Sequence, residues 1–197
     1  MRDKLAFKKT ELDELPIEWD ITTIRDVCYK PQYGYTESAT TEPIGPKFLR
    51  ITDIRTGRVN WEKVPYCKCD PDLVEKYRLE SGDMLFARTG STGNSYLVKE
   101  CPEAIFASYL IRLKPKRIID PFFLHYFFNS VQYWRQIQQK MVGSIQKGIN
   151  ATILSSLELP FPPRVEQRGI AEVLSTVDEA IQWTDAVIAK AEELKRG

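Results

Sequence analysis

Few residues of this 197-residue sequence have the types and spacing that catalysis requires. His125 is the only histidine and stands among aromatic residues, so a Ser–His–Asp arrangement would depend on it alone and we expect it to be structural. Cys67 and Cys69 are spaced as metal ligands can be, but Cys28 and Cys101 are distant and no histidine is near. The sequence therefore predicts no catalytic centre and no metal site.

One glycine-rich stretch superficially resembles a phosphate-binding loop. Residues 90–95 read GSTGNS, without the Gly-Lys-Ser/Thr ending that would place a lysine on the β- and γ-phosphates. The sequence also has no G-x-G-x-x-G dinucleotide motif. Nucleotide hydrolysis is therefore not supported.

Three polar loops, 33–41, 88–95 and 144–150, instead have side chains suited to DNA. Arginine pairs with guanine and asparagine or glutamine with adenine in the major groove, whereas hydroxyls and backbone N–H groups suit phosphates. Each loop alone is equally typical of an ordinary turn. The residues expected to face DNA are Tyr33, Tyr35, Thr36, Arg88, Ser91, Thr92, Asn94, Lys140, Gln146, Lys147 and Asn150. Among them, Arg88, Asn94 and Gln146 are predicted to read bases, and Lys140 and Lys147 to contact phosphates.

The distribution of charge is more informative than its sum, because 28 Lys and Arg against 27 Asp and Glu leave a net charge of +1. Between positions 104 and 157 the only acidic residue is Asp120. The basic residues of that segment are Arg112, Lys114, Lys116, Arg117, Arg135, Lys140 and Lys147. Such an asymmetry indicates a polyanionic partner, and the alternative is a solvated face that serves solubility.

The composition is that of an ordinary globular protein, with 43% apolar and 28% charged residues. No run approaches the ~20 apolar residues of a membrane span, and the first residues lack the apolar region of a secretion signal. The four cysteines are expected to be reduced thiols, and a cytoplasmic location follows.

The segment before position 160 is predicted to be mixed α/β. Asp120 and Pro121 have the types preferred at the N-cap and first position of a helix, which we expect to continue to about Lys140. Trp19–Cys28 is expected to form a short amphipathic element. The expected strands are Phe48–Ile54, Met84–Ala87, Tyr96–Val98, Ile105–Leu113 and Ile153–Leu159.

The sequence changes character after the prolines at 160, 162 and 163, which mark a boundary. From Glu166 to Arg196 there is no proline, and apolar residues recur in steps of four and three. We call this register the apolar seam, and it comprises Ile170, Leu174, Val177, Ile181, Thr184, Ile188 and Ala191. It predicts a long helix that pairs with a second helix in a coiled coil. The alternative is a terminal helix packed on its own domain.

The boundary also carries a recognisable motif. Residues 159–167, LPFPPRVEQ, with Ile170, Leu174 and Asp178 beyond them, closely resemble the start of the conserved spacer helix in type I restriction–modification specificity subunits. Further matching segments, in the family's order, are Leu15-Pro16-x-x-Trp19, Phe48–Ile54 with Gly57, Leu79–Leu85 and Arg88-x-Gly90. The resemblance covers nearly the whole chain.

The resemblance implies an α/β target recognition domain over residues 1–160 and a helical spacer and dimerisation region over 164–197. It implies a non-catalytic subunit that reads one half of a split DNA sequence and docks modification subunits, and through them restriction subunits. It places S-adenosylmethionine and ATP on those partners and no cofactor on this chain.

One departure from the family's layout bears on assembly, because a full specificity subunit has two recognition domains and two spacers whereas this chain has one of each. Either this is a half-length subunit or it is a piece of a longer chain. A half-length subunit would form a homodimer on a two-fold axis and read inverted half-sites. The alternative functions are a non-enzymatic interaction adaptor with a coiled-coil helix and a stand-alone nuclease or methyltransferase. The nuclease or methyltransferase would require a carboxylate-rich metal site or a cofactor loop, and the sequence shows neither.

Overall fold

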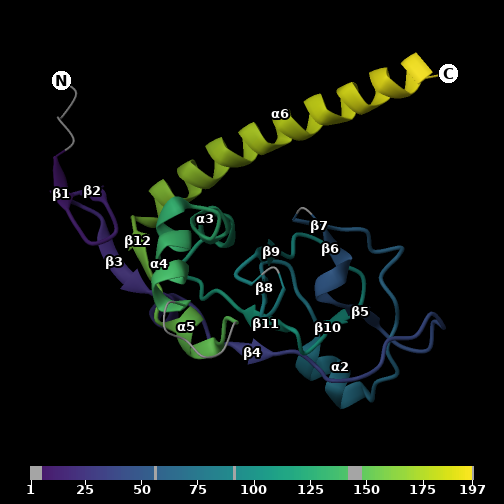
Figure 1. The fold of residues 1–197 in the computed structure, drawn as a ribbon. Helices are drawn as coiled ribbons and strands as arrows, with labels where there is room; N and C mark the ends of the chain where they lie inside the picture. Colours follow the sequence, from purple (N-terminus) through teal and green to yellow (C-terminus); the bar gives the residue numbers. More distant parts are fainter. Residues whose placement is uncertain (1–5, 56, 91, 142–147, 197) are drawn as a thin grey trace.

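A mixed α/β body with one long projecting helix makes up the protein (Figure 1). The structure is a computed structural model and describes residues 6–55, 57–90, 92–141 and 148–196. The projecting helix is α6, Arg164–Arg196, and at 33 residues it is about 50 Å long. The predicted fold class is confirmed.

A four-stranded antiparallel sheet occupies the middle of the body, in the order β4-β11-β8-β9. Its strands are β4 (Gln32–Tyr33), β11 (Leu110–Leu113), β8 (Met84–Ala87) and β9 (Ser95–Leu97). Every residue of β8 and β11 is buried, so both faces of the sheet are covered. The run Met84–Ala87 was predicted as a strand and is one.

Short elements surround this sheet. The paired strands are β1 (Phe7–Lys9) with β2 (Glu14–Pro16), β3 (Asp20–Thr23) with β12 (Glu158–Phe161), β5 (Lys47–Leu49) with β10 (Ala104–Phe106), and β6 (Ile54–Arg55) with β7 (Arg58–Val59). The helices are α1 (Ile24–Val27), the 3₁₀ turn η1 (Ile51–Asp53), α2 (Pro71–Tyr77), α3 (Pro121–Phe127), α4 (Val131–Met141) and α5 (Ala151–Ser155).

The helix that begins after Asp120 is shorter than predicted. Asp120 does cap it, because its carboxylate accepts hydrogen bonds from the N–H groups of Phe122 (3.0 Å) and Phe123 (3.3 Å). The helix then ends at Phe127, and Ser130 starts α4 by accepting a hydrogen bond at its Oγ from the N–H of Tyr133 (3.3 Å). A second cap inside the run thus divides one predicted helix into α3 and α4.

Two predicted strands are interrupted by turns. The run Ile105–Leu113 contains most of β10 and all of β11, separated by a turn at Ser108–Tyr109. The run Phe48–Ile54 ends as a strand at Leu49, because the carboxylate of Asp53 accepts the Arg50 N–H (2.9 Å) and closes a 3₁₀ turn. Sequence alternation alone missed both breaks.

Two further expectations were wrong in type. Ile153–Leu159 contains the end of α5 as well as the start of β12, because Asn150 caps α5 through a hydrogen bond from the Ile153 N–H to its Oδ1 (2.9 Å). Trp19–Cys28 is not one amphipathic element but contains β3 and the single turn α1. Pro160, expected to break regular structure, lies within β12.

The apolar core has one main cluster on each face of the sheet. Phe86 of β8 packs against Phe128 with ring centroids 4.6 Å apart, and Phe128 packs against Tyr133 of α4 at 5.3 Å. The opposite cluster contains Leu85 of β8 and Leu110 of β11. The sheet is therefore held rigidly between two hydrophobic layers, and its loops are presented from a fixed frame.

Burial removes part of the predicted basic face. Arg112 lies inside the domain, where its Nη1 is 3.2 Å from the Oδ2 of Asp83. Burial raises the pKa of Asp83, and the Arg112 guanidinium opposes that shift. Lys114 pairs with Glu80 at 2.7 Å, and Lys116 donates to the carbonyl of Asp26 at 2.8 Å. These three basic side chains contribute to internal structure as well as to surface charge.

The first turns of α6 are fixed to the domain by residues of the boundary motif. Gln167 is fully buried, accepts the Asp120 N–H at its Oε1 (2.8 Å) and donates from Nε2 to the carbonyl of Pro162 (2.9 Å). Trp19 Nε1 donates to Glu166 Oε2 (2.8 Å). The start of the helix is therefore held in one orientation relative to the α/β body.

Replacing Gln167 with leucine is expected to lower the free energy of unfolding by about 3 kcal/mol. The substitution leaves the Asp120 N–H and the Pro162 carbonyl buried without partners, at about 1–3 kcal/mol for each group. Glu166→Ala is the matched control, because it removes an exposed hydrogen bond of the same segment. Urea unfolding measures both, and equal midpoints for the two variants would contradict the role given to Gln167.

Candidate DNA interface

An arginine stacked on a tyrosine lies at the end of the central sheet where β8 leaves it. Arg88 follows β8, and its guanidinium carbon is 4.6 Å from the centroid of the Tyr33 ring on β4. Its Nη1 donates to the carbonyl of Ser108 (2.9 Å), and its backbone N–H donates to the carbonyl of Tyr109 (3.0 Å). The guanidinium is thereby oriented, and its other N–H groups donate to no residue in the part of the chain that the structure describes.

The Tyr33 hydroxyl joins this group to a third segment, because it accepts the N–H of Ala151 (3.1 Å) at the start of α5. The Arg88 carbonyl likewise accepts the N–H of Ile149 (3.2 Å). Segments predicted separately from the sequence therefore meet at one place. We call the side chains at this place the reading surface, namely Tyr33, Arg88, Asn94, Tyr109 and Asn150.

The loop between β8 and β9 is held against α4 by close contacts. Gly93 has φ +91°, and a Cβ there would lie 3.0 Å from Cζ3 of Trp134 and 3.2 Å from Cδ1 of Ile149. The Tyr133 hydroxyl donates to the Gly93 carbonyl (2.6 Å), and burial raises the pKa of Tyr133. A larger residue at this φ would be strained and would crowd Trp134 and Ile149, so the loop that carries Arg88 and Asn94 is packed closely here.

Two glycines of the same loop provide a matched test of that packing. Gly90→Ala is expected to cost about 1 kcal/mol, because φ is +70° but nothing lies within 4 Å of the new Cβ. Gly93→Ala is expected to cost about 1–3 kcal/mol more, because its Cβ also meets Trp134 and Ile149. Thermal or urea unfolding measures the difference. Equal effects would show that the loop does not depend on this contact.

The other predicted DNA-facing residues are distributed unequally. In the β8–β9 loop, Asn94 is exposed and Thr92 is half-buried. Thr36 is exposed in the loop that follows β4, and Lys140 is exposed on α4. Asn150 belongs to the reading surface, but its Oδ1 is engaged in capping α5. Ser91, Gln146 and Lys147 lie outside the described residues.

Tyr35 does not share the reading surface with Tyr33. Its ring centroid is 5.4 Å from that of Tyr77 on α2, and it packs against the cluster that contains Phe48 and Ile105. Its backbone N–H donates to the carbonyl of Phe106 (2.8 Å). The structure thus gives Tyr35 a packing role.

Sequence reasoning missed Ser108 and Tyr109. Tyr109 is 59% exposed beside Arg88, in the turn between β10 and β11. Ser108 and the Tyr109 hydroxyl interrupt the apolar residues between Ala104 and Ile111, and that interruption was the available signal for a turn. An exposed tyrosine beside an arginine can stack on a base or contact a phosphate.

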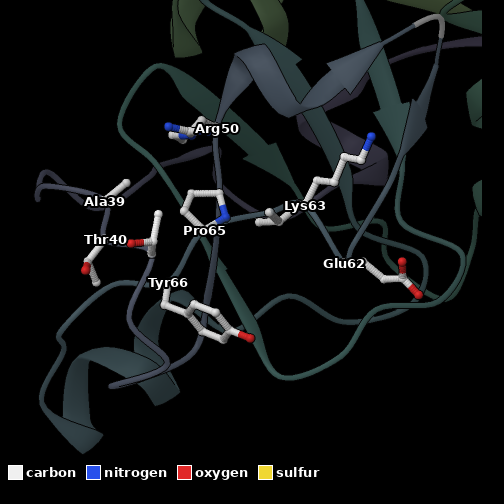
Figure 2. A pocket seen from close by; sticks show the side chains of 9 residues that line it. Ala39, Thr40, Arg50, Glu62, Lys63, Pro65 and Tyr66 are labelled. Carbon is white, nitrogen blue, oxygen red and sulfur yellow. The ribbon is translucent and has the colours of Figure 1, made fainter.

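A separate concavity of about 410 Å³ lies on the part of the domain that contains β5, β6 and β7. Figure 2 shows Thr40, Arg50, Pro65 and Tyr66 among its lining side chains. Arg50 is fixed there by Asp53, with its Nη2 2.8 Å from Oδ1 and its Nε 3.0 Å from Oδ2. The end of the predicted 33–41 loop thus contributes to this concavity.

The residues considered for catalysis and metal binding, His125 and the cysteines, are partly or fully buried. His125 is half-buried and burial lowers its pKa, while burial raises the pKa of Cys67 to about 11. Over the described ranges there is no group of three or more His, Cys, Asp and Glu that could hold a metal ion. Among the same residues, no helix is both long and apolar enough to cross a membrane.

Most of the apolar seam is exposed along α6. Leu174, Val177, Ile181 and Ile188 are between 38% and 54% exposed. Ile170 differs, because it packs against the core of its own domain together with buried Ala171. The alternative of a helix packed on its own domain therefore holds for its start only, and Ile170 is not a free seam residue. Val173 and Val187, at neighbouring register positions, are also exposed and widen the seam.

Comparison with known proteins agrees with this architecture. The model of the family described as type I restriction modification DNA specificity domain matches residues 16–193. The putative type I restriction enzyme MjaX specificity subunit of Methanocaldococcus jannaschii is 30% identical over an alignment of 200 positions, which covers 97% of this chain and 47% of that protein. The type I restriction enzyme EcoBI specificity subunit of Escherichia coli is 25% identical, covering 91% of this chain and 39% of that protein.

Solved structures share the fold. A chain solved in a study of complex assembly and conformational transition of the type I R-M system has a TM-score of 0.71 at 22% identity, covering 96% of this chain and 46% of that one. The HsdS subunit from Thermoanaerobacter tengcongensis has a TM-score of 0.62 at 20% identity, covering 89% and 41%.

This chain spans about half the length of the curated relatives that it matches. The predicted resemblance to type I specificity subunits is confirmed at the level of the family, because the relatives described are specificity subunits. The match over residues 16–193 includes the α/β body from residue 16 onward and nearly all of α6. The chain belongs to the family of type I restriction–modification DNA specificity domains.

Proposed function

We propose that this chain is the sequence-specific DNA-binding component of a type I restriction–modification system and reads one half of a bipartite target. In this proposal it works in the cytoplasm on double-stranded DNA and has no catalytic centre. It docks modification subunits, which hold S-adenosylmethionine and methylate adenine, and through them restriction subunits, which hydrolyse ATP. The recognition domain covers residues 1–160 and the spacer region 164–197.

The observation that carries this proposal is the oriented guanidinium of Arg88. It lies over the Tyr33 ring and donates a hydrogen bond to the Ser108 carbonyl. The exposed residues Asn94 and Tyr109 belong to the same reading surface. Arginine with fixed orientation suits guanine, and asparagine suits adenine. Because both faces of the sheet are buried, the loops at its end are the part of the frame available for base contacts.

The exposed apolar seam supports the second half of the proposal. A helix about 50 Å long with an uncovered apolar stripe is stabilised by a second helix. If that helix belongs to a second copy, the two recognition domains are related by a two-fold axis and read inverted half-sites. The length of the helix then sets the gap between them.

Selection from a random DNA library tests DNA reading directly. The chain, assembled with the modification subunit of its own system, would be allowed to bind random duplexes, and the retained DNA would be sequenced. We expect enrichment of a fixed sequence separated from a second fixed sequence by a constant gap. If DNA is retained without any enriched sequence, or is not retained at moderate salt, the proposed DNA reading is wrong and the adaptor function is favoured.

A further inference from the structure

A cationic cavity lies where the recognition domain meets α6, at the other end of the sheet from the reading surface. Its volume is about 410 Å³, and its lining includes Lys114, Lys116, Arg117, Arg164, Ser81 and Asp83. Arg164 is the first residue of α6. The cavity is therefore built by the domain and the helix together.

Two of its cations lack partners within the part of the chain that the structure describes. Lys114 is paired with Glu80, and Lys116 with the carbonyl of Asp26. Arg117 and Arg164 make no ion pair with a described residue, and the buried Nη1 of Arg164 has no hydrogen-bond acceptor. A buried guanidinium nitrogen without an acceptor is unfavourable, so the site is suited to an incoming anion.

The lining of the cavity also contains a carboxylate with an unused acceptor. Asp83 is 1% exposed, and its Oδ2 accepts from Arg112 and from the N–H of Glu80. Its Oδ1 is buried without a hydrogen-bond donor among the described residues. The cavity thus combines unused donors with an unused acceptor, which matches a ligand that carries carboxylates next to N–H groups.

The position of the cavity separates it from DNA on the reading surface. Asp83 precedes β8 and Arg88 follows it, so the two sites lie at opposite ends of a four-residue strand, about 13 Å long. Lys114 likewise follows β11, at the end away from Tyr109. Since both faces of the sheet are buried, a straight duplex on the reading surface does not pass along the strands to the cavity.

We propose that this cavity receives an acidic segment of the modification subunit, whose carboxylates bind Arg117 and Arg164. The inference rests on the proposed function, because that function supplies the partner. Arginine forks bind carboxylates in bidentate geometry, and peptide N–H groups beside those carboxylates can donate to Asp83. Docking at this place engages the domain and the start of α6 at once, which fixes the partner relative to the DNA target.

The test reverses the charges of Arg117 and Arg164 and measures the affinity of the chain for the modification subunit and for DNA. Arg117→Glu/Arg164→Glu is expected to weaken binding of the modification subunit by about 30-fold or more while DNA affinity stays unchanged. Unchanged DNA affinity also shows that the variant is folded. Arg58→Glu/Lys68→Glu, on exposed residues of the part that contains β7, makes the same change in net charge and is expected to leave subunit affinity unchanged. Arg117→Lys/Arg164→Lys keeps the charge and is expected to weaken binding of the modification subunit less than the charge reversal does.

Other outcomes identify a different occupant and overturn the inference. Reduced DNA affinity and a shallower salt dependence, with subunit binding intact, would mean that DNA phosphates occupy the cavity. A change only in self-association would mean that a second copy does. If the unmodified chain binds DNA and the modification subunit and the charge reversal alters neither affinity, this inference alone fails. If the unmodified chain binds neither, the proposed function fails as well.

Discussion

Replacing Val177 and Ile181 with aspartate is expected to prevent α6 from pairing and to leave the recognition domain folded. The two side chains are 50% and 54% exposed, so their native environment in the single chain tolerates charge. In a paired helix the same positions are buried against the partner. Burying an isolated carboxylate is strongly unfavourable, and each apolar side chain removed also loses about 1.5–3 kcal/mol of burial.

The expected result is a loss of self-association by at least about 100-fold in dissociation constant, measured by sedimentation equilibrium. Gln182→Asp/Ala186→Asp places the same two charges on the opposite side of the helix and is expected to associate as the unsubstituted chain does. Thermal unfolding of the recognition domain should be the same in both variants. Self-association that survives Val177→Asp/Ile181→Asp would show that the seam is not the pairing surface.

Replacing Arg88 with alanine is expected to relax recognition at one base position. The guanidinium stacked on Tyr33 is the best-oriented donor group of the reading surface, and a bidentate contact to guanine is worth about 1–3 kcal/mol of discrimination. Affinity for the matched site should fall by about 5- to 150-fold, whereas affinity for DNA mismatched at that position should scarcely change. Binding isotherms with matched and singly mismatched duplexes measure this.

Two control substitutions separate base reading from other roles of Arg88. Lys140→Ala removes an exposed cation from α4 and is expected to weaken all sequences equally, with a salt dependence lower by about one ion. Tyr33→Phe removes the hydroxyl that accepts the Ala151 N–H but keeps the ring under Arg88, so discrimination should be retained. If matched and mismatched sites shift together in Arg88→Ala, Arg88 does not read a base.

Local sequence signals predicted the elements whose limits depend on neighbouring residues. The capping pair Asp120-Pro121 does begin a helix, and the heptad pattern predicted a helix over 164–197 where α6 spans Arg164–Arg196. Both signals act within one or two turns, so no tertiary information is required to use them. The strand Met84–Ala87 was equally clear, because a short apolar run follows a glycine turn.

Elements that depend on competing local interactions were not predictable in the same way. Between Ile105 and Ile111 the run is apolar except at Ser108 and the hydroxyl of Tyr109, where the chain turns. The segment at 151–155 has the composition of a strand, and the cap made by Asn150 decides for a helix. Periodicity does not separate a short buried helix from a short buried strand.

The reading surface required tertiary structure. Tyr33 and Arg88 are 55 positions apart in the sequence and meet because β4 and β8 flank β11. The sequence also overestimated the exposed positive charge of residues 104–157, since only the fold shows that Arg112 lies inside the domain against Asp83. Residue types thus indicated DNA binding, while the identity of the side chains that act together came from strand pairing.

A methylation map tests the central claim, that this chain reads one half of a split DNA target, most directly. The chain would be co-expressed with the modification subunit of its own system, and modified adenines would be located by single-molecule sequencing. The account predicts methylation at a split motif with two identical, inverted halves and a constant gap. A split motif with unlike halves would contradict pairing of two copies through α6. No methylation from a complex that co-purifies would contradict the claim itself and favour the adaptor function.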